Sequence, residues 1–265
     1  MDISVIIPCY NHGAYLLEAV NSVQDFKCTY EIIVVDDGSS DANTLAVLEQ
    51  LKEKGVVVLH QENGGPSKAR NTAIAVAKGD YILPLDSDNS INPLVFEKAL
   101  DVLKANENIT VVYTDAEYMG NKKGLWKVGQ LDEAKIFISN QIDTCALIRK
   151  SDLIAVGGYD ENKEIMSNED WELWLKMLYN NKLFYYLEEV GFKYRVSEQS
   201  LSATIAKPKY KLLLSYLVKK YPLFYADSYK NILEQNALNK KKIRDYFKNN
   251  KIKASLKILL GRKVI

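Results

Sequence analysis

Short apolar runs alternate with amphipathic stretches along the first half of the chain. Val and Ile dominate these runs, and each run is apolar on both faces, as strands are in a sheet that is covered on both sides. They are residues 3–8, 31–36, 56–60, 81–86 and 110–115. The pattern predicts five strands that are buried in a mainly parallel sheet.

The stretches between these runs have helical spacing. Residues 14–24, 41–54, 67–77 and 93–105 place apolar side chains three or four positions apart, and Pro93 suits the first turn of the last helix. Strand–helix alternation of this kind indicates an α/β fold with three layers and right-handed crossovers. We therefore expect helices on both faces of the sheet.

The alternation weakens after about residue 116. A strand is expected at 144–149, a helix at 169–179, and two short strands at 183–187 and 191–196. From about residue 205 to the end the pattern is helical throughout. The predicted organisation is a catalytic domain over 1–205, with halves of about 1–115 and 116–205, followed by a helical extension over 206–265.

The distribution of charge supports this division. The net charge is only +1, but residues 206–265 hold sixteen Lys and Arg against three Asp and Glu, whereas residues 1–205 hold nineteen against thirty-one. A helix with a basic face and an apolar face suits the surface of an anionic membrane. Packing against the acidic domain, or formation of a homo-oligomer, explains the same pattern. No nucleic-acid-binding motif is present, so we expect no nucleic-acid partner.

Cysteine and histidine usage limits the chemistry. Cys9, Cys28 and Cys145 are widely separated and form no CxxC pair, which predicts reduced thiols and a cytoplasmic location. With only two histidines, a zinc site of the His/Cys kind is not expected, so any metal should be a hard ion bound by oxygen. No apolar run is long enough to span a bilayer, and the amino terminus does not resemble a signal peptide.

Polar side chains follow four of the predicted strands. They lie in residues 8–11, 36–41, 63–71 and 86–88. Because ligands of open parallel sheets bind beyond the carboxyl ends of the strands, these segments should form one site. The Asp36-Asp37 pair fits a turn before a helix cap, but it also fits acceptors for a base or a ribose.

The glycine-rich segment 63–71 can be a loop with a helix cap. Alternatively, its backbone amides and Arg70 approach a diphosphate at the amino terminus of a helix. The segment is not a Walker motif, and no GxGxxG follows the first strand. Kinase, NTPase and dinucleotide-dehydrogenase functions are therefore disfavoured.

Two acidic motifs suggest catalysis. Asp86 and Asp88 are two residues apart directly after an apolar strand, and they offer hard oxygen ligands to Mn²⁺ or Mg²⁺. Farther along the chain, acids at the start of the predicted 169–179 helix would complement the helix dipole. Asp170 there could instead be the general base that deprotonates an acceptor hydroxyl group.

Taken in order, these motifs resemble the family 2 glycosyltransferases, which have the GT-A fold. The resemblance rests on VIIPCYN, VVDDGSSD, ENGGPSKARN, ILPLDSDN, GGYDE and NEDWELWLK, which extend from residue 3 to about residue 200. It implies an inverting, single-displacement transfer from a nucleoside diphosphate sugar, UDP being the expected nucleotide. The acceptor implied is a hydroxyl of a glycan or of a lipid-linked saccharide in cell-surface polysaccharide synthesis. The cysteine usage and the basic residues 206–265 predict a cytoplasmic location, with peripheral contact at the inner face of the membrane.

The resemblance also assigns residues to roles. Asp170 would be the catalytic base, Asp88 the main metal ligand, and Asp86 a second ligand that faces the sugar and ribose. The nucleotide-sugar site would comprise Pro8, Tyr10, Asp36, Asp37, Gly65, Arg70, Asp86 and Ser87. The acceptor pocket would comprise Gly158, Tyr159, Asp160, Glu169 and Trp171.

One position departs from the family pattern. Many relatives have a histidine after a Tyr-Arg pair, where it helps to bind metal or diphosphate, but this chain has Tyr194-Arg195-Val196-Ser197. Either Ser197 or Arg195 substitutes, or the metal is held more weakly. Two other functions remain to be weighed: a sugar-1-phosphate nucleotidyltransferase, which usually has a glycine-rich basic loop after strand one, and an inactive nucleotide-sugar-binding module.

Overall fold

A computed structural model describes residues 1–197 and 207–249 of the chain. The chain divides into two compact units, Met1–Leu217 and Val218–Ile265. The boundary predicted between residues 205 and 206 lies outside the described residues. The sheet and all of the predicted site residues belong to the first unit, which we call the catalytic unit.

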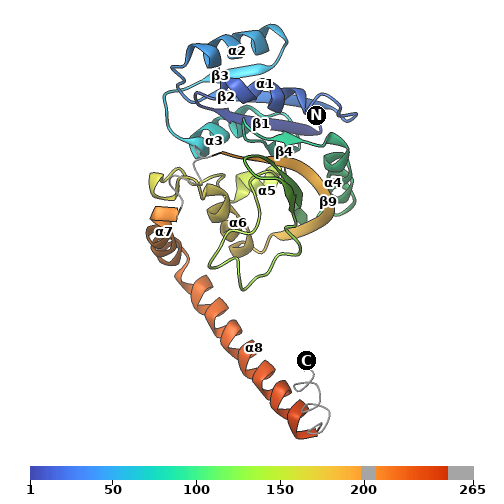
Figure 1. Ribbon diagram of the computed structural model, residues 1–265, viewed down its shortest axis with the longest axis vertical. Helices are drawn as coiled ribbons and strands as arrows, with labels where there is room; N and C mark the ends of the chain where they lie inside the picture. The colour runs from blue at the N-terminus through green and yellow to red at the C-terminus, as the bar shows by residue number, and fades with distance from the viewer. Residues whose placement is uncertain (198–206, 250–265) are drawn as a thin grey trace. The chain divides into compact units, whose positions relative to one another are not determined.

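Four parallel strands form one half of the sheet (Figure 1). They lie in the order β3-β2-β1-β4. Their bounds are Ile3–Cys9 for β1, Tyr30–Asp36 for β2, Val57–His60 for β3 and Tyr81–Pro84 for β4. Because parallel strands need crossover connections, α1 (Gly13–Asn21), α2 (Ala42–Glu53) and α3 (Pro66–Val76) return the chain each time. The carboxyl ends of all four strands therefore meet at one edge.

The other half of the sheet is mixed. β8 pairs antiparallel with β4 and β6, while the long β6 and β9 pair in parallel. The short β5 and β7 add antiparallel to β9 and β6. The bounds are Ser90–Ile91 for β5, Ile109–Gly120 for β6, Gly124–Trp126 for β7, Leu147–Arg149 for β8 and Leu183–Val196 for β9.

Helices cover both faces of the sheet, as alternate residues of the strands require. Ile7 of β1 packs in a cluster with residues of α1, α2 and α4 (Pro93–Ala105). Its neighbour Ile6 packs on the opposite face with residues of α3, α5 (Lys150–Ala155) and α6 (Glu169–Tyr179). The predicted three-layer fold with a mainly parallel sheet is confirmed.

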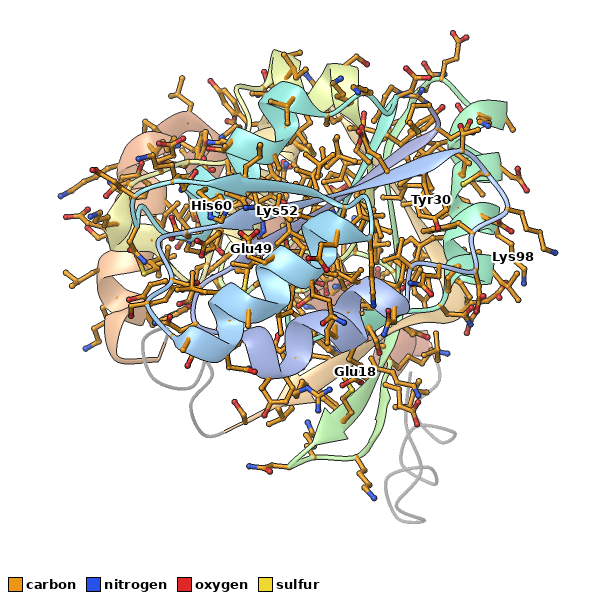
Figure 2. The ribbon with its side chains drawn as sticks, turned by 90° about the horizontal axis from the view of Figure 1, so that it is seen from above. Glu18, Tyr30, Glu49, Lys52, His60 and Lys98 are labelled. Carbon is orange, nitrogen blue, oxygen red and sulfur yellow. The ribbon has the colours of Figure 1, made fainter. Side chains whose placement is uncertain are left out.

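Several details differ from the prediction. Residues 183–187 and 191–196 belong to one strand, β9, whose pairing with β6 shifts register between Thr114 and Ala116. β3 is an edge strand and not a buried one: Val57 is 39% exposed. Figure 2 shows His60 of β3 beside Glu49 and Lys52 of α2 at this edge. The 3₁₀ helix Lys163–Ile165 and the short elements α5, β5 and β7 were not predicted.

Two helices account for the described part of the basic extension. α7 (Lys207–Lys220) contributes Leu213 and Leu217 to the interior of the catalytic unit, where both are almost completely buried. α8 (Pro222–Asn249) is exposed over most of its length. Among the described residues, no helix combines the length and apolar character that crossing a bilayer would require.

Candidate active site

Asp37 organises the loop after β3. Its own amide donates to the carbonyl oxygen of Cys9 at 2.8 Å. Its carboxylate accepts from Gln61 Nε2 at 2.7 Å and from the amides of Gly64 and Gly65 at 2.8 Å each. Asp37 is only 4% exposed. The carboxylate therefore ties the glycine loop to the ends of β1 and β2.

Asp36 has a similar structural environment. It accepts from the Ser39 amide at 2.9 Å and from His60 Nδ1 at 3.0 Å. Burial opposes ionisation of this carboxyl group, but the hydrogen bonds from Ser39 and His60 outweigh it, so the pKa of Asp36 is lowered. Of the two residues predicted beside it, Pro8 is partly buried, whereas Tyr10 is 51% exposed at the rim.

The loop after β1 connects the other loops of the site. Asn11 Oδ1 accepts from the amides of Ser40 and Asp41 at 2.9 and 3.0 Å. The next residue, His12, contacts Ser87 Oγ through Nδ1 at 3.1 Å. The segments after β1, β2 and β4 are thus in direct contact, as the sequence predicted.

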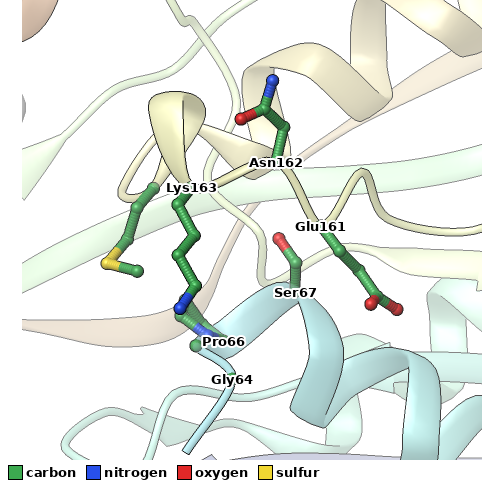
Figure 3. A pocket seen from close by; sticks show the side chains of 8 residues that line it. Gly64, Pro66, Ser67, Glu161, Asn162 and Lys163 are labelled. Carbon is green, nitrogen blue, oxygen red and sulfur yellow. The ribbon is translucent and has the colours of Figure 1, made fainter.

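A small pocket lies where the glycine loop enters α3. Gly65 has φ of 90°, and a Cβ atom there would approach Met166 to 3.2 Å, so both conformation and space favour glycine. Figure 3 shows Lys163 extending toward Pro66 at the start of α3. The pocket is lined by Gly64, Gly65, Pro66, Ser67, Glu161, Asn162, Lys163 and Met166.

Arg70 of α3 is the centre of a buried ion-pair network. Its Nη2 donates to Asp86 Oδ1 and its Nη1 to Glu169 Oε1, both at 2.7 Å. The guanidinium carbon lies 5.2 Å from the centroid of the Tyr159 ring, and the residue is 3% exposed. Burial disfavours the charge, but the carboxylates of Asp86 and Glu169 outweigh this, so the pKa of Arg70 is raised.

The Asp86-Ser87-Asp88 turn follows β4. The amide of Asn89 closes the turn on the carbonyl oxygen of Asp86 at 3.0 Å. Arg195 of β9 donates through Nε to the carbonyl oxygen of Asp88 at 2.8 Å. Arg195, one of the two residues expected to substitute for the histidine that follows this Tyr-Arg pair in many relatives, therefore fixes the backbone of this turn.

The carboxylates of the turn suit a hard divalent cation. Burial and the nearby charge of Asp86 raise the pKa of Asp88 to about 6. A bound cation would relieve this repulsion, and Mg²⁺ or Mn²⁺ needs only one or two protein carboxylates when water and phosphate complete its shell. No group of three or more His, Cys, Asp or Glu suited to a metal occurs among the residues described. Asp86 and Asp88 thus fit a metal that is shared with a ligand.

Asp170 lies in the first turn of α6, next to the ion-pair network. Its Oδ1 accepts from the Trp171 amide at 2.8 Å, and its Oδ2 accepts from Asn140 Nδ2 at 2.7 Å. Burial and the charge of Glu169 raise the pKa of Asp170 to about 7. A carboxyl group that titrates near neutral pH is suited to accept a proton from a substrate.

The residues predicted to surround Asp170 are mostly packed into the protein. Trp171 is 2% exposed, and its Nε1 donates to the carbonyl oxygen of Ile136. Tyr159 lies buried under Arg70, and its hydroxyl group contacts Thr144 Oγ1 at 3.1 Å. Glu169 Oε2 is buried without a hydrogen-bond partner. These side chains therefore support the site from the interior of the protein.

Gly158 and Asp160 complete this support. The side chain of Asn71 accepts from the Tyr159 amide at 2.9 Å and donates to the Tyr159 carbonyl oxygen at 2.8 Å. Lys176 of α6 donates to the Gly158 carbonyl oxygen at 2.7 Å, and the Tyr216 hydroxyl of α7 donates to Asp160 Oδ2. The loop is therefore fixed by three helices.

Asp143, just before β8, was missed by the sequence analysis. Burial and the charges of Asp86 and Asp170 raise the pKa of Asp143 well above its ordinary range, so Asp143 lies near both of these carboxyl groups. It belongs to no recognised motif. Only its position before a short apolar strand, at the same edge of the sheet as the other acids, could have suggested it.

The chain matches known proteins over most of its length. Residues 4–157 match the family model described as Glycosyl transferase family 2. An uncharacterized glycosyltransferase of Rickettsia typhi is 31% identical over 82% of this chain and 72% of its own length. One of Haemophilus influenzae is 31% identical over 66% of this chain.

Solved structures agree on the fold. The crystal structure of Staphylococcus aureus TarS 1-349 in complex with UDP-GlcNAc has a TM-score of 0.64 and 23% identity, covering 82% of this chain and 66% of that one. Mannosyltransferase PcManGT from Pyrobaculum calidifontis, in complex with GDP-Man and Mn²⁺, has a TM-score of 0.57 and 18% identity, covering 89% of this chain and 75% of that one.

Several relatives are longer than this chain. The chain spans 62% of the Haemophilus influenzae protein, 33% of glycosyltransferase GlyG of Streptococcus pneumoniae and 31% of a Rickettsia conorii homologue. The region that matches the family model, residues 4–157, nevertheless includes β1 to β4 and the loops that follow them. By its sequence, the chain belongs to glycosyl transferase family 2.

Proposed function

We propose that the chain transfers a sugar from a nucleoside diphosphate sugar to a hydroxyl group of a glycan or lipid-linked saccharide, with inversion and with the help of Mn²⁺ or Mg²⁺. The observation that carries this proposal is the array Asp86–Arg70–Glu169. It joins the Asp86-Ser87-Asp88 turn at one end to Asp170, whose pKa is near neutral, at the other.

In the proposed reaction, Asp170 removes the proton from the acceptor hydroxyl group. The acceptor oxygen forms a bond to the anomeric carbon, and the bond from that carbon to the diphosphate oxygen breaks on the opposite face. The electron pair leaves with the nucleoside diphosphate, so the configuration inverts. Asp170 must be ionised to act, and the backbone amide of Trp171 and Asn140 Nδ2 hold its two oxygens in place.

Asp88 and Asp86 would hold the metal. When bound, the ion neutralises charge that develops on the leaving diphosphate. Arg70 is 3% exposed and already donates to two carboxylates. In our proposal it therefore orients Asp86, and the phosphates are bound by the metal and by residues at the exposed rim of the site. Tyr10, at that rim, is the side chain available to stack on a base.

The relatives suggest which substrates to test first. TarS is named poly(ribitol-phosphate) β-N-acetylglucosaminyltransferase, and GgaB of Bacillus subtilis is named a minor teichoic acid biosynthesis protein. TarS structures contain UDP-GlcNAc and UDP. We therefore propose a UDP-sugar donor, with UDP-GlcNAc as the first candidate, and a cell-surface polysaccharide as the acceptor.

We further propose that the basic extension brings a cytoplasmic enzyme to the inner face of an anionic membrane. In α8, Lys240, Lys241 and Lys242 are exposed, and so are Leu223 and Leu233. Cationic and apolar groups on one helix favour binding to anionic lipid surfaces. The predicted Ser255–Ile265 part of this surface lies outside the described residues.

Replacing Asp170 tests the base. Asp170→Asn should lower the release of UDP from UDP-GlcNAc about 10²–10⁴-fold, because the proton acceptor is lost, while calorimetric binding of UDP stays within about twofold. In the unchanged protein, the rate should rise with pH through about 7, where Asp170 ionises. Asp101→Asn, on the exposed face of α4, is the matched control. Turnover that survives Asp170→Asn nearly intact would remove Asp170 from the mechanism.

Replacing Asp88 tests the metal site. Asp88→Ala should weaken UDP binding in the presence of Mn²⁺ by about tenfold or more, because one of two hard ligands is lost. Binding in EDTA should change little. Isothermal titration with UDP, GDP and dTDP measures both effects and gives the base preference. Equal weakening with and without Mn²⁺ would contradict the assignment.

Replacing Asp143 tests whether the acids repel one another. The raised pKa means that ionisation of Asp143 destabilises the folded state, and this cost grows as pH rises above about 4. Asp143→Asn should therefore raise the melting temperature in EDTA by about 2–4 °C at pH 8, with the difference vanishing near pH 4. A lower melting temperature at pH 8, compared with the Asp101→Asn control, would show that Asp143 is not repelled.

Removing α8 tests the membrane proposal. Because Leu213 and Leu217 of α7 are buried in the catalytic unit, the chain should be cut after Tyr221 and not after residue 205. The shortened protein should keep its melting temperature but no longer sediment with phosphatidylglycerol vesicles at low salt. Phosphatidylcholine vesicles are the control. If the full chain itself stays in the supernatant with anionic vesicles, the membrane proposal fails.

A further inference from the structure

The segment 132–140 leads up to the Asp170 carboxylate and ends beside it. The segment begins at Asp132, whose Oδ1 accepts from the amides of Ala134 and Lys135 at 3.0 and 3.2 Å. It ends at Asn140, whose Nδ2 donates to Asp170 Oδ2 at 2.7 Å. No recognised motif includes Asn140, and the sequence analysis did not select it.

Two aromatic side chains hold this segment. Trp171 Nε1 donates to the carbonyl oxygen of Ile136, and the Tyr210 hydroxyl of α7 donates to the carbonyl oxygen of Ile138 at 2.6 Å. The two rings stack, with centroids 6.3 Å apart and planes 15° apart. Ile136 itself is completely buried. The backbone before Asn140 is therefore fixed from α6 and from α7 at once.

We propose that Asn140, held in place by Tyr210 of α7, is a positioning residue that keeps the Asp170 carboxylate oriented and ionised for proton abstraction. An amide that donates to a carboxylate stabilises the ionised form and fixes the orientation of the carboxylate plane. The proposal rests on Asp170 being the base, as proposed above. It makes α7 part of the acceptor side of the site.

The hydrogen bond from Asn140 is important because neighbouring carboxylates repel the ionised form of Asp170. Glu169 on α6 and Asp143 before β8 both repel the carboxylate, and the Tyr159 hydroxyl also lies near it. Arg70 on α3 is the opposing cation, but it is shared with Asp86 and Glu169. Asn140 and the Trp171 amide are the hydrogen-bond donors to Asp170 in the described part of the chain.

The test is a pH titration of the full-length protein by two independent measurements. The first follows the backbone amide resonance of Trp171, which donates to Asp170 and reports its ionisation without any substrate. The second follows the rate of UDP release from UDP-GlcNAc with Mn²⁺ at saturating donor. Asn140→Ala should move both midpoints up by about 0.5–1 pH unit, because the donor to the ionised form is lost.

The charge of the side chain introduced at position 140 distinguishes an electrostatic effect on Asp170 from a general loss of order in the segment 132–140. Asn140→Asp should move the midpoints farther than Asn140→Ala, since a second carboxylate would face Asp170. Tyr210→Phe keeps the ring stack but loses the hydroxyl bond, and should give a smaller shift in the same direction. Asn231→Ala and Tyr229→Phe, at exposed positions of α8, are matched controls that should change neither midpoint.

The outcomes distinguish this inference from the proposed function. Unchanged Trp171 midpoints in both Asn140 variants, with melting temperatures like that of the unchanged protein, would overturn the role of Asn140. A shifted Trp171 midpoint with an unshifted rate profile, together with an active Asp170→Asn variant, would instead show that Asp170 is not the base. If the Asn140 variants unfold, they give no amide titration, and the Tyr210→Phe variant then tests the proposal. If Tyr210→Phe shifts neither midpoint, the proposal is overturned.

Discussion

The buried guanidinium of Arg70 holds the two sides of the site together. One terminal nitrogen donates to Asp86 in the Asp86-Ser87-Asp88 turn, and the other donates to Glu169 at the start of α6, ninety-nine residues from Arg70 in the chain. Removing one partner of such a buried pair costs about 3–5 kcal/mol, because a charge is left without compensation. One buried side chain therefore links the Asp86-Ser87-Asp88 turn directly to the start of α6.

Acidic side chains outnumber cationic ones around Arg70, which leaves this part of the site short of positive charge. Arg70 faces Asp86 and Glu169 directly, while burial and the charges of Asp86 and Asp170 raise the pKa of Asp143. A divalent cation at Asp86 and Asp88 would supply part of the missing charge, and a proton taken up by Asp170 would supply more. The repulsion among these carboxylates would thus favour both cation binding and the uptake of a proton by Asp170 in the proposed reaction.

The sequence predicted those features that depend on local patterns. The apolar runs located β1, β2, β4 and β6, and the polar residues at their ends located the site, because parallel strands bring their carboxyl ends to one edge. It could not predict that Asp37 would bind the amides of Gly64 and Gly65, since that depends on the path of the loop. Asp143 and Asn140 were missed for the same reason: neither belongs to a motif, and only tertiary contacts bring them to Asp170.

Charge and packing place the end of the catalytic unit at different points. Basic composition changes near residue 206, but the compact unit continues to Leu217, because a few side chains of α7 decide the packing. Leu213 and Leu217 are buried, Tyr216 donates to Asp160, and Tyr210 holds the segment that carries Asn140. The basic composition reflects the side chains that face water, whereas the residues of α7 that make these contacts face the protein. A helix that looks like part of a basic tail in the sequence is therefore a structural element of the catalytic unit that contacts the segments around Asp170.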